Sequence, residues 1–301
     1  MIPPADLPRL ARRPRASHKH DYGRVVVIGG SAGMAGAPIL AALAALRCGA
    51  GLVEVIVPEP IAAVAAGFDP CLMVRGLPAD GDGAFAAAAD PSITARVAGA
   101  QAVVIGPGLG RGTAIPGIVA RRWTEARVPT VFDADALWAL APRPPSGGLA
   151  AGPRILTPHE GELGRFVTAR MGDSRTALED AAERLAEATQ SVVLLKGPDT
   201  LVTHGGRRWH NPTGNPGMAT GGTGDVLAGM IAALCCQPCA LPRGPTVRPP
   251  VSDVARLAVW AHGRAGDLAA AQLGEVSLTA RDLLAHLPAA LLELLADRHP
   301  A

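Results

Sequence analysis

Short runs of β-branched residues alternate with longer runs of alanine and leucine along most of the chain. The run at residues 24–28 (RVVVI) is apolar at nearly every position, which is typical of a strand that is buried on both faces. The run at residues 176–188 has the spacing of an amphipathic helix. Strands and helices that alternate in this way predict an α/β fold, with a central, mostly parallel sheet and helices on both of its faces.

The same pattern places the individual elements. We expect strands at residues 24–28, 52–57, 102–105, 130–132, 154–156 and 192–195, and a hairpin formed by residues 201–203 and 207–210. We expect helices at residues 37–47, 114–125, 176–188, 225–235, 252–272 and 279–296. Residues 141–152 and 237–250 are rich in proline and glycine and predict loops. Because the alternation resumes after the first loop, we predict a single domain, with its ligand site beyond the carboxyl ends of the strands.

The composition excludes several classes of protein. Of the 301 residues, 49% are apolar and 18% are charged, so the chain has the means to form a core and is not expected to be disordered. The net charge of +2 is not typical of a nucleic-acid-binding protein. Apolar stretches reach about half of the ~20 residues that a membrane span needs. We therefore expect neither a nucleic-acid partner nor a membrane.

The cysteines and the N-terminus add two further expectations. Five cysteines, an odd number, favour reduced thiols and a cytoplasmic location. Cys236 and Cys239 form a CxxC pair without a second pair or a suitably spaced histidine, so we expect a structural role for them. Residues 1–17 contain several arginines and no apolar core, which predicts a flexible basic tail before a domain at residues 18–301.

The stretch NPTGNPGMATGGTGDVLAG, at residues 211–229, carries the strongest chemical signal. Its glycines allow backbone amides to approach an anion, and the helix that follows adds its positive N-terminal end. We therefore predict an anion hole at Gly221, Gly222, Thr223 and Gly224. Asp225 stands where a phosphate-binding loop has lysine, which suits a base that takes a proton from an attacking hydroxyl. The alternative is that Asp225 only caps the helix.

Other predicted strand ends also carry glycines and polar residues. The loops at residues 29–38 and 106–110 do not match the dinucleotide-binding pattern GxGxxG, since the third position of the second loop is Arg111. Asp133 and Asp135 follow a strand, and each either caps a helix or turn or binds a magnesium-bound water. Thr157 and Glu160 fit a capping box, which leaves His159 free to donate a hydrogen bond to a substrate.

The turn at residues 196–200 has a purely structural and a functional interpretation. Pro198 and Asp199 are common turn residues, so the segment Lys196, Gly197, Pro198, Asp199 and Thr200 is either a simple turn or a nucleotide-contacting loop. We predict no set of protein metal ligands in the sequence, because the histidine of TPHE has no partner at HExxH spacing.

Together these motifs resemble the ADP-dependent NAD(P)H-hydrate dehydratases, which have a ribokinase-like fold. The resemblance runs in order through HKHDYGRVVVIGGSAGMAGAP, VVIGPGLG, FDADAL, ILTPHEGE, LLKGPDT and NPTGNPGMATGGTGDVLAG, from about residue 18 to the last helices. The sequence departs from the usual pattern at Met34 and Ala35, where relatives often have an aromatic and a hydroxyl residue. That departure puts side-chain contacts from this loop in doubt.

The resemblance implies an activity and a set of site residues. Such enzymes remove water from the S epimer of NADH hydrate or NADPH hydrate and convert ADP to AMP and phosphate, with magnesium; eukaryotic relatives use ATP. By this resemblance Ala37, Gly108, His159 and Asp225 bind the hydrate, with Asp225 as the base. Residues 196–200 and Gly224 contact the nucleotide. The family also implies a homotetramer that works with a separate NAD(P)H-hydrate epimerase, and we expect no epimerase domain here.

Two other functions stay open from the sequence. A small-molecule kinase of the same fold, acting on a vitamin-precursor alcohol or a sugar with ATP, would have the same Asp225 and glycine-rich loop. A catalytically silent nucleotide-sensing protein is the third alternative, and the intact GGTGD stretch weakens it.

Overall fold

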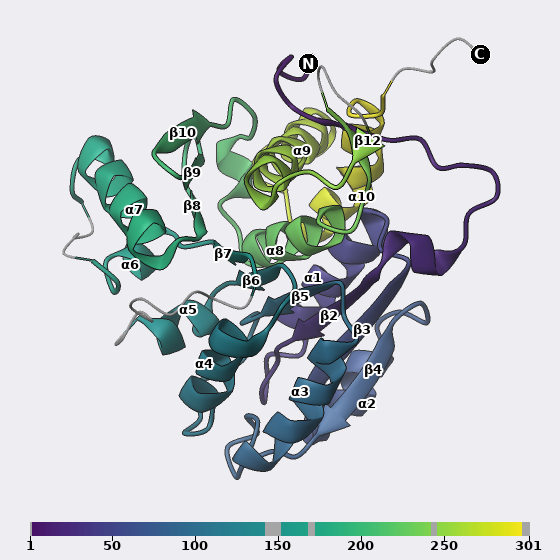
Figure 1. Ribbon diagram of the computed structural model, residues 1–301, viewed down its shortest axis with the longest axis vertical. Helices are drawn as coiled ribbons and strands as arrows, with labels where there is room; N and C mark the ends of the chain where they lie inside the picture. Colours follow the sequence, from purple (N-terminus) through teal and green to yellow (C-terminus); the bar gives the residue numbers. More distant parts are fainter. Residues whose placement is uncertain (1, 142–151, 168–171, 242–245, 297–301) are drawn as a thin grey trace.

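The computed structural model describes residues 2–141, 152–167, 172–241 and 246–296, and Figure 1 shows their arrangement. Within these ranges the centre of the molecule is a nine-stranded sheet in the order β10-β9-β8-β7-β6-β5-β2-β3-β4. The strands from β2 to β8 pair in parallel, whereas β9 and β10 are antiparallel additions at one edge. The bounds are β2 Arg24–Ile28, β3 Leu52–Pro58, β4 Met73–Leu77, β5 Ala102–Ile105, β6 Thr130–Phe132, β7 Arg154–Leu156, β8 Val192–Leu195, β9 Leu201–His204 and β10 Arg207–His210.

Helices cover both faces of this sheet, as the apolar strands predicted (Figure 1). Alternate residues of β2 show why: Val25 and Val27 join one core, and Val26 and Ile28 join the other. The first core is formed with α1 Gly36–Arg47, α8 Thr223–Leu234, α9 Val251–Leu273 and α10 Ala280–Leu292, with the short α2 Ala62–Ala66 beside them. The second is formed with α3 Asp90–Ala98, α4 Ile115–Glu125, α5 Asp135–Leu140, α6 Glu160–Leu163 and α7 Arg175–Thr189.

Every strand and helix expected from the sequence is present, with bounds that shift by a few residues at most. The hairpin turns at Gly205 and Gly206, which both have positive φ. Strand β4 and helices α2 and α3 were not expected. Helices α5 and α6 were implied only by the candidate capping residues that precede them. The loop predicted at residues 141–152 falls mostly outside the described residues. The loop predicted at residues 237–250 contains two short strands, β11 Cys239–Ala240 and β12 Thr246–Val247.

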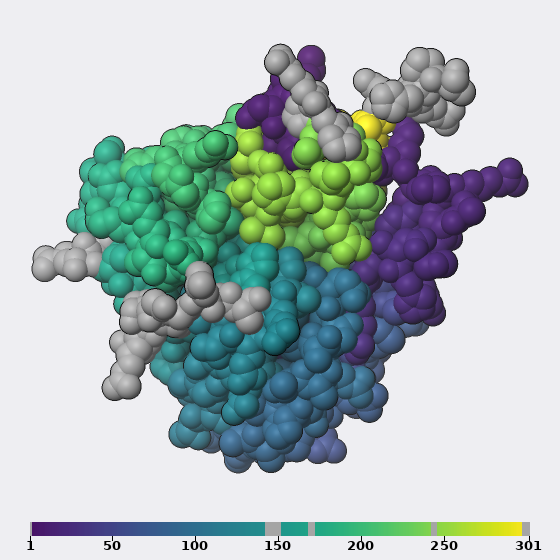
Figure 2. All heavy atoms as spheres, in the orientation of Figure 1, coloured from purple at the N-terminus to yellow at the C-terminus, as the bar shows by residue number. Residues whose placement is uncertain are grey.

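The N-terminal segment differs from the solvated tail expected for residues 1–17. Leu7 is fully buried, and β1 Arg9–Leu10 pairs with β11 in a small three-stranded sheet with β12. The backbone of Leu10 also bonds to the end of the chain, since its amide donates to the carbonyl of Leu294 at 2.8 Å. In Figure 2 this purple segment lies on the surface beside the C-terminal helices. Arg9 therefore lies in a packed part of this segment, whereas Arg12, Arg13 and Arg15 follow it at exposed positions.

The cysteines agree with the structural role expected for the CxxC pair. Cys236 and Cys239 are both buried and unbridged, and burial raises their thiol pKa to about 11 and about 12 respectively. Thiols with such pKa values are poor nucleophiles and poor metal ligands at neutral pH. In the part of the chain that is described, no helix combines the length and the apolar character needed to cross a bilayer.

Candidate active site

The polar residues that follow three neighbouring strands come together at one edge of the sheet. Asp133 directly follows β6, Thr157 directly follows β7 and Lys196 directly follows β8. Because these strands are parallel neighbours, their carboxyl ends meet at the same edge, which is where ligands bind in open α/β sheets. The polar residues that the sequence singled out are therefore gathered at the edge of the sheet where a ligand site was predicted.

Helix α8 begins at this edge with exposed backbone donors. Its N-cap is Gly222, which has a φ of 93° and makes no side-chain cap. Its positive φ favours glycine, and a Cβ there would lie 2.6 Å from Leu40 Cδ1 of α1, so the end of that side chain would have to move. Since no side chain caps this end, the first amides of α8 can donate to a bound anion.

Asp225 is the third residue of α8, and it does not act as a helix cap. No hydrogen bond to its carboxylate is found among the described residues, whereas Asp282, at the same position of α10, accepts from the Thr279 amide at 2.9 Å. Burial raises the pKa of Asp225 to about 8, and the neighbouring Asp133 adds to this while Lys196 opposes it. A carboxylate that is held without partners is available to accept a proton from a ligand.

A cavity of about 840 Å³ opens in front of this helix start. It is bounded by the β8–β9 turn, the segment that leads into α8, and the face of α9 that carries Val259 and His262. Most of the predicted nucleotide and anion residues line it, namely Lys196, Gly197, Pro198, Asp199, Thr200, Gly221, Thr223 and Gly224, and so does His159, which was predicted to bind the hydrate. Gly222 and Asp225 are their immediate neighbours in the chain.

Two predicted hydrate-binding residues lie together outside that cavity. A Cβ at Gly108 would be 3.2 Å from the Cβ of Ala37, so the loop after β5 and the start of α1 are in contact. Leu40, one turn further along α1, contacts Gly222 at the start of α8. Ala37 and Gly108 are therefore connected to the α8 start through the first turns of α1.

The capping box predicted for Thr157 and Glu160 is wrong, because the helix starts two residues later. The N-cap of α6 is His159, whose Nδ1 accepts from the Gly161 amide at 3.0 Å, and Glu162 accepts from the His159 amide at 2.8 Å. Thr157 instead donates its hydroxyl to Asp133 at 2.7 Å. The imidazole of His159 thus has a local structural partner as well as a place on the cavity wall.

Asp133 and Asp135 have partners that the sequence did not suggest. Asp133 Oδ1 lies 2.9 Å from Lys196 Nζ, so its carboxylate forms an ion pair across β7. Asp135 accepts the Gly110 amide at 3.0 Å and thereby fixes the glycine loop after β5. Helix capping was one of the roles that the sequence left open for these two residues, and neither of them caps a helix.

Sequence reasoning missed His262, which lies on α9 and lines the cavity. Its Nε2 lies 2.9 Å from the carbonyl oxygen of Thr223, the first residue of α8. Burial lowers the pKa of His262 to about 4, so the ring is neutral at physiological pH and its N–H donates to that carbonyl. The apolar run around His262 gave no signal, because a histidine in a buried helix usually has a structural role.

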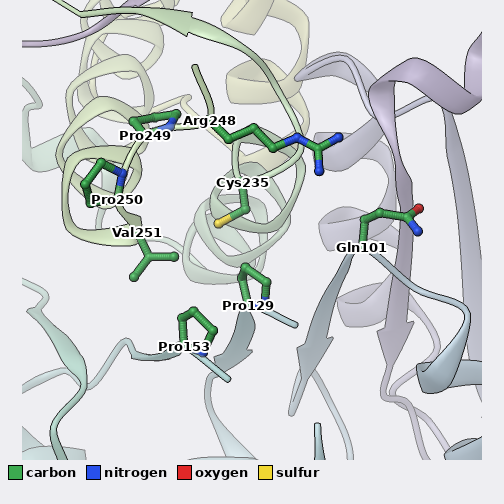
Figure 3. Close-up of a pocket in the computed structure, with 8 residues that line it drawn as sticks. All are labelled: Gln101, Pro129, Pro153, Cys235, Arg248, Pro249, Pro250 and Val251. Atoms are coloured by element: carbon green, nitrogen blue, oxygen red, sulfur yellow. The ribbon is translucent and has the colours of Figure 1, made fainter. Parts of the chain in front are cut away.

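A second cavity, of about 440 Å³, lies at the opposite edge of the sheet (Figure 3). Pro129 and Pro153 come just before β6 and β7, and Cys235 comes from the end of α8. Arg248 is the one charged residue among its described lining residues. The acid–base groups that could perform chemistry are therefore gathered at the carboxyl edge.

Comparison with solved structures defines the class of protein. A ribokinase-like protein from Enterococcus faecalis superposes with a TM-score of 0.78 and 28% identity, over 95% of this chain and 93% of that one. The ADP/ATP-dependent NAD(P)H-hydrate dehydratase of Bacillus subtilis, co-crystallised with ATP/Mg2+, gives 0.78 and 29%, over 95% of each chain. The chain therefore has a ribokinase-like fold.

Within that class, residues 25–289 match the NAD(P)H-hydrate dehydratase family, and the chain belongs to it. A bifunctional NAD(P)H-hydrate repair enzyme of Moorella thermoacetica is 41% identical over 281 residues, 93% of this chain and 51% of the relative. An ADP-dependent (S)-NAD(P)H-hydrate dehydratase of Xanthomonas campestris pv. campestris is 34% identical over 278 residues, 90% of this chain and 88% of the relative. The chain thus spans about half the length of the bifunctional relative.

Proposed function

We propose that this protein dehydrates the S epimer of NAD(P)H hydrate to NAD(P)H and converts ADP to AMP and phosphate. The observation that carries the proposal is the position of Asp225. Its carboxylate lies in the first turn of a helix that follows a glycine-rich loop, it does not cap that helix, and the chain belongs to the dehydratase family. The cavity beside Asp225 has the size of a small-molecule site, and it is bounded by the predicted nucleotide loop. The name of the Xanthomonas relative supports the donor and the epimer.

The chemistry follows from the poor leaving ability of hydroxide. Asp225 takes the proton of the ring hydroxyl while the hydroxyl oxygen attacks the β-phosphorus of ADP. The bond between this phosphorus and the bridging oxygen breaks, and AMP leaves with that oxygen. The hydrate then carries a phosphate ester. The lone pair of the ring nitrogen expels this phosphate, and loss of a proton from the adjacent carbon restores the dihydronicotinamide ring.

The start of α8 supplies the stabilisation that such a transfer needs. The amides after Gly222 and the ammonium of Lys196 face the same end of the cavity, where a Cβ on Gly224 would be 3.5 Å from Lys196 Nζ. Fixed donors and a cation at this place stabilise negative charge on the phosphoryl group during transfer. His262 holds the Thr223 carbonyl and so supports the position of these amides.

The described residues form no dedicated magnesium-binding site of protein ligands. In the described ranges no group of three or more histidine, cysteine, aspartate or glutamate side chains converges as a metal site. Mg2+ usually keeps several waters and binds through nucleotide phosphates, and the Bacillus subtilis relative was co-crystallised with ATP/Mg2+. We therefore propose that the ion enters with the nucleotide, and no step above depends on a protein ligand for it.

The proposal is tested by turnover. Purified protein is mixed with NADH hydrate, magnesium and either ADP or ATP, and the near-ultraviolet absorbance of NADH is followed. We expect recovery of absorbance with ADP and formation of AMP in equal amount. No recovery with either nucleotide, together with intact nucleotide binding, would contradict the proposal and favour an ATP-dependent alcohol kinase.

The acid–base group gives a second prediction. Because burial and Asp133 raise the pKa of Asp225 to about 8, the base is protonated below that pH in the free enzyme. We expect kcat/KM for ADP to rise with pH along a single limb centred near pH 8. The measurement is a pH profile at constant ionic strength, corrected for the solvent-driven decay of the hydrate, and a flat profile from pH 6 to 9 would exclude Asp225 as the base.

The wider setting of the reaction is also a proposal. We propose a cytoplasmic homotetramer that works with a separate NAD(P)H-hydrate epimerase. The reduced cysteines support the location, and the bifunctional names of the longer relatives support a companion activity.

A further inference from the structure

Asp133 has an unusual place among the carboxylates of the site. It is 2% exposed, at the end of a central strand, and its Oδ1 accepts both the hydroxyl of Thr157 at 2.7 Å and the ammonium of Lys196 at 2.9 Å. A Cβ on Gly106 would lie 1.7 Å from the Asp133 carbonyl oxygen, so the glycine loop after β5 also packs directly on its backbone. Two neighbouring strand ends therefore fix the direction of this carboxylate, and the glycine loop fixes the position of its backbone.

Lys196 is held just as closely. Its side chain is 20% exposed, and a second carboxylate, Glu162, lies 3.6 Å from Nζ. Burial alone would lower the pKa of Lys196, but Asp133 and Glu162 outweigh it and the pKa is raised, so the ammonium stays charged. The chain contains only one other lysine, Lys19, among 28 lysine and arginine residues. A compact ammonium rather than a broad guanidinium thus occupies the site.

We propose that Asp133 is a positioning residue, whose buried carboxylate holds the ammonium of Lys196 beside the first turn of α8, where the phosphoryl group is transferred. This inference rests on the proposed function and deepens it. A flexible lysine side chain would otherwise turn its charged end toward water. The pair with Asp133 keeps the charge within reach of the cavity, and the hydrogen bond from the hydroxyl of Thr157 orients the Asp133 carboxylate.

A test that does not need activity uses the small number of lysines. In protein labelled with ¹³C at the lysine ε-carbon, Lys196 and the exposed Lys19 give two signals that can be titrated separately. We expect Asp133→Asn to lower the pKa of Lys196, because the partly buried ammonium loses its nearer counter-charge. Lys19 should titrate as before. An unchanged Lys196 titration would overturn the proposal even if the wild-type protein showed no dehydratase activity.

The matched control is Glu54→Gln. Glu54 is also a buried carboxylate, 3% exposed, and it pairs with Arg24 and Arg96 on β2 and α3, away from the cavity. We expect this variant to lose stability but to keep the wild-type Lys196 titration, kcat and pH profile. A general effect of removing a buried charge would instead move these readouts in both variants.

Activity then tests whether Asp133 acts through Lys196. We expect Asp133→Asn to lower kcat roughly 100-fold with little change in KM for ADP, since a displaced charge fails in the transfer step. The pH limb should move to lower pH, because Asp225 loses Asp133, the largest of the like charges that raise its pKa.

A double-mutant cycle gives the decisive comparison. In a Lys196→Met background, Asp133→Asn should cost less than about threefold in kcat, because the group that it positions is gone. Additive losses would mean that Asp133 acts by another route.

Should Asp133→Asn not fold, Thr157→Val removes the donor that fixes the carboxylate. We expect it to shift the limb in the same direction by less, and an unshifted limb would overturn the proposal. Absence of wild-type turnover would instead contradict the proposed function.

Discussion

The Asp225→Asn enzyme is expected to lose roughly 1,000-fold in kcat with NAD(P)H hydrate and ADP, since general-base catalysis contributes about 10²–10⁴-fold. The amide keeps the shape of the side chain but cannot accept the proton of the attacking hydroxyl. Binding of ADP should remain within about threefold of wild type, because Asp225 does not line the cavity that the nucleotide loop bounds. Single-turnover kinetics and calorimetric ADP titration measure the two effects separately.

The same variant should be at least as stable as the wild type at pH 7. Folding raises the pKa of Asp225 from 3.8 to about 8, chiefly by burial. Between these two pH values the unfolded chain has released the proton and the folded protein has not, so the free energy of unfolding falls as pH rises. Asparagine cannot ionise and removes this loss. A carboxylate that lowers the stability of the folded protein in this way is typical of a functional residue.

Asp282→Asn is the matched control for Asp225→Asn. Asp282 occupies the same position in its helix, but it makes the capping bonds to Thr279 that Asp225 lacks. We expect Asp282→Asn to lose about 1 kcal/mol of stability and to keep full turnover. If Asp225→Asn behaved like Asp282→Asn, with lower stability and near-wild-type turnover, Asp225 would be a helix cap and not the base.

Much of the fold could be predicted from the sequence because its signals are strong and local. Strands such as β2 and β8 are apolar throughout, which a parallel sheet covered on both faces requires. Strand β4 was missed because it lies at the edge of the sheet and carries Arg75 and Gly76, so its residues alternate between exposed and partly buried positions. The small sheet of β1, β11 and β12 was missed because two-residue strands have no periodicity.

Within the site, the chain segments were predicted better than the partners of their side chains. The Asn211–Gly229 region and the loop at Lys196 were found because glycine-rich loops at strand ends leave a local pattern. The pair of Asp133 with Lys196 joins residues that are 63 positions apart, so no local spacing reports it. The capping box was wrongly predicted at Thr157 for the same reason. The hydroxyl of Thr157 bonds to Asp133, which is distant in sequence, instead of capping the nearby helix.

The glycine at position 229 sets how closely α8 approaches α1, and its substitution should have the largest effect on stability. A Cβ at Gly229 would lie 1.8 Å from the backbone oxygen of Ala41, so the two helices touch through their main chains. Gly229→Ala must push them apart. Overpacking in a core costs about 1–3 kcal/mol, and a clash with backbone belongs at the upper end, which corresponds to a fall of about 5 °C in Tm for a chain of this length.

Gly117→Ala is the matched control, because Gly117 lies in α4, exposed, with no atom within 4 Å of the added Cβ. There alanine should stabilise the protein by about 0.5–1 kcal/mol through its better helix propensity. Separation of α1 and α8 should also disturb the contact of Leu40 with Gly222, so Gly229→Ala should lose turnover at temperatures where it remains folded. Thermal unfolding and kcat of both variants decide this, and a wild-type Tm for Gly229→Ala would show that α8 does not depend on this contact.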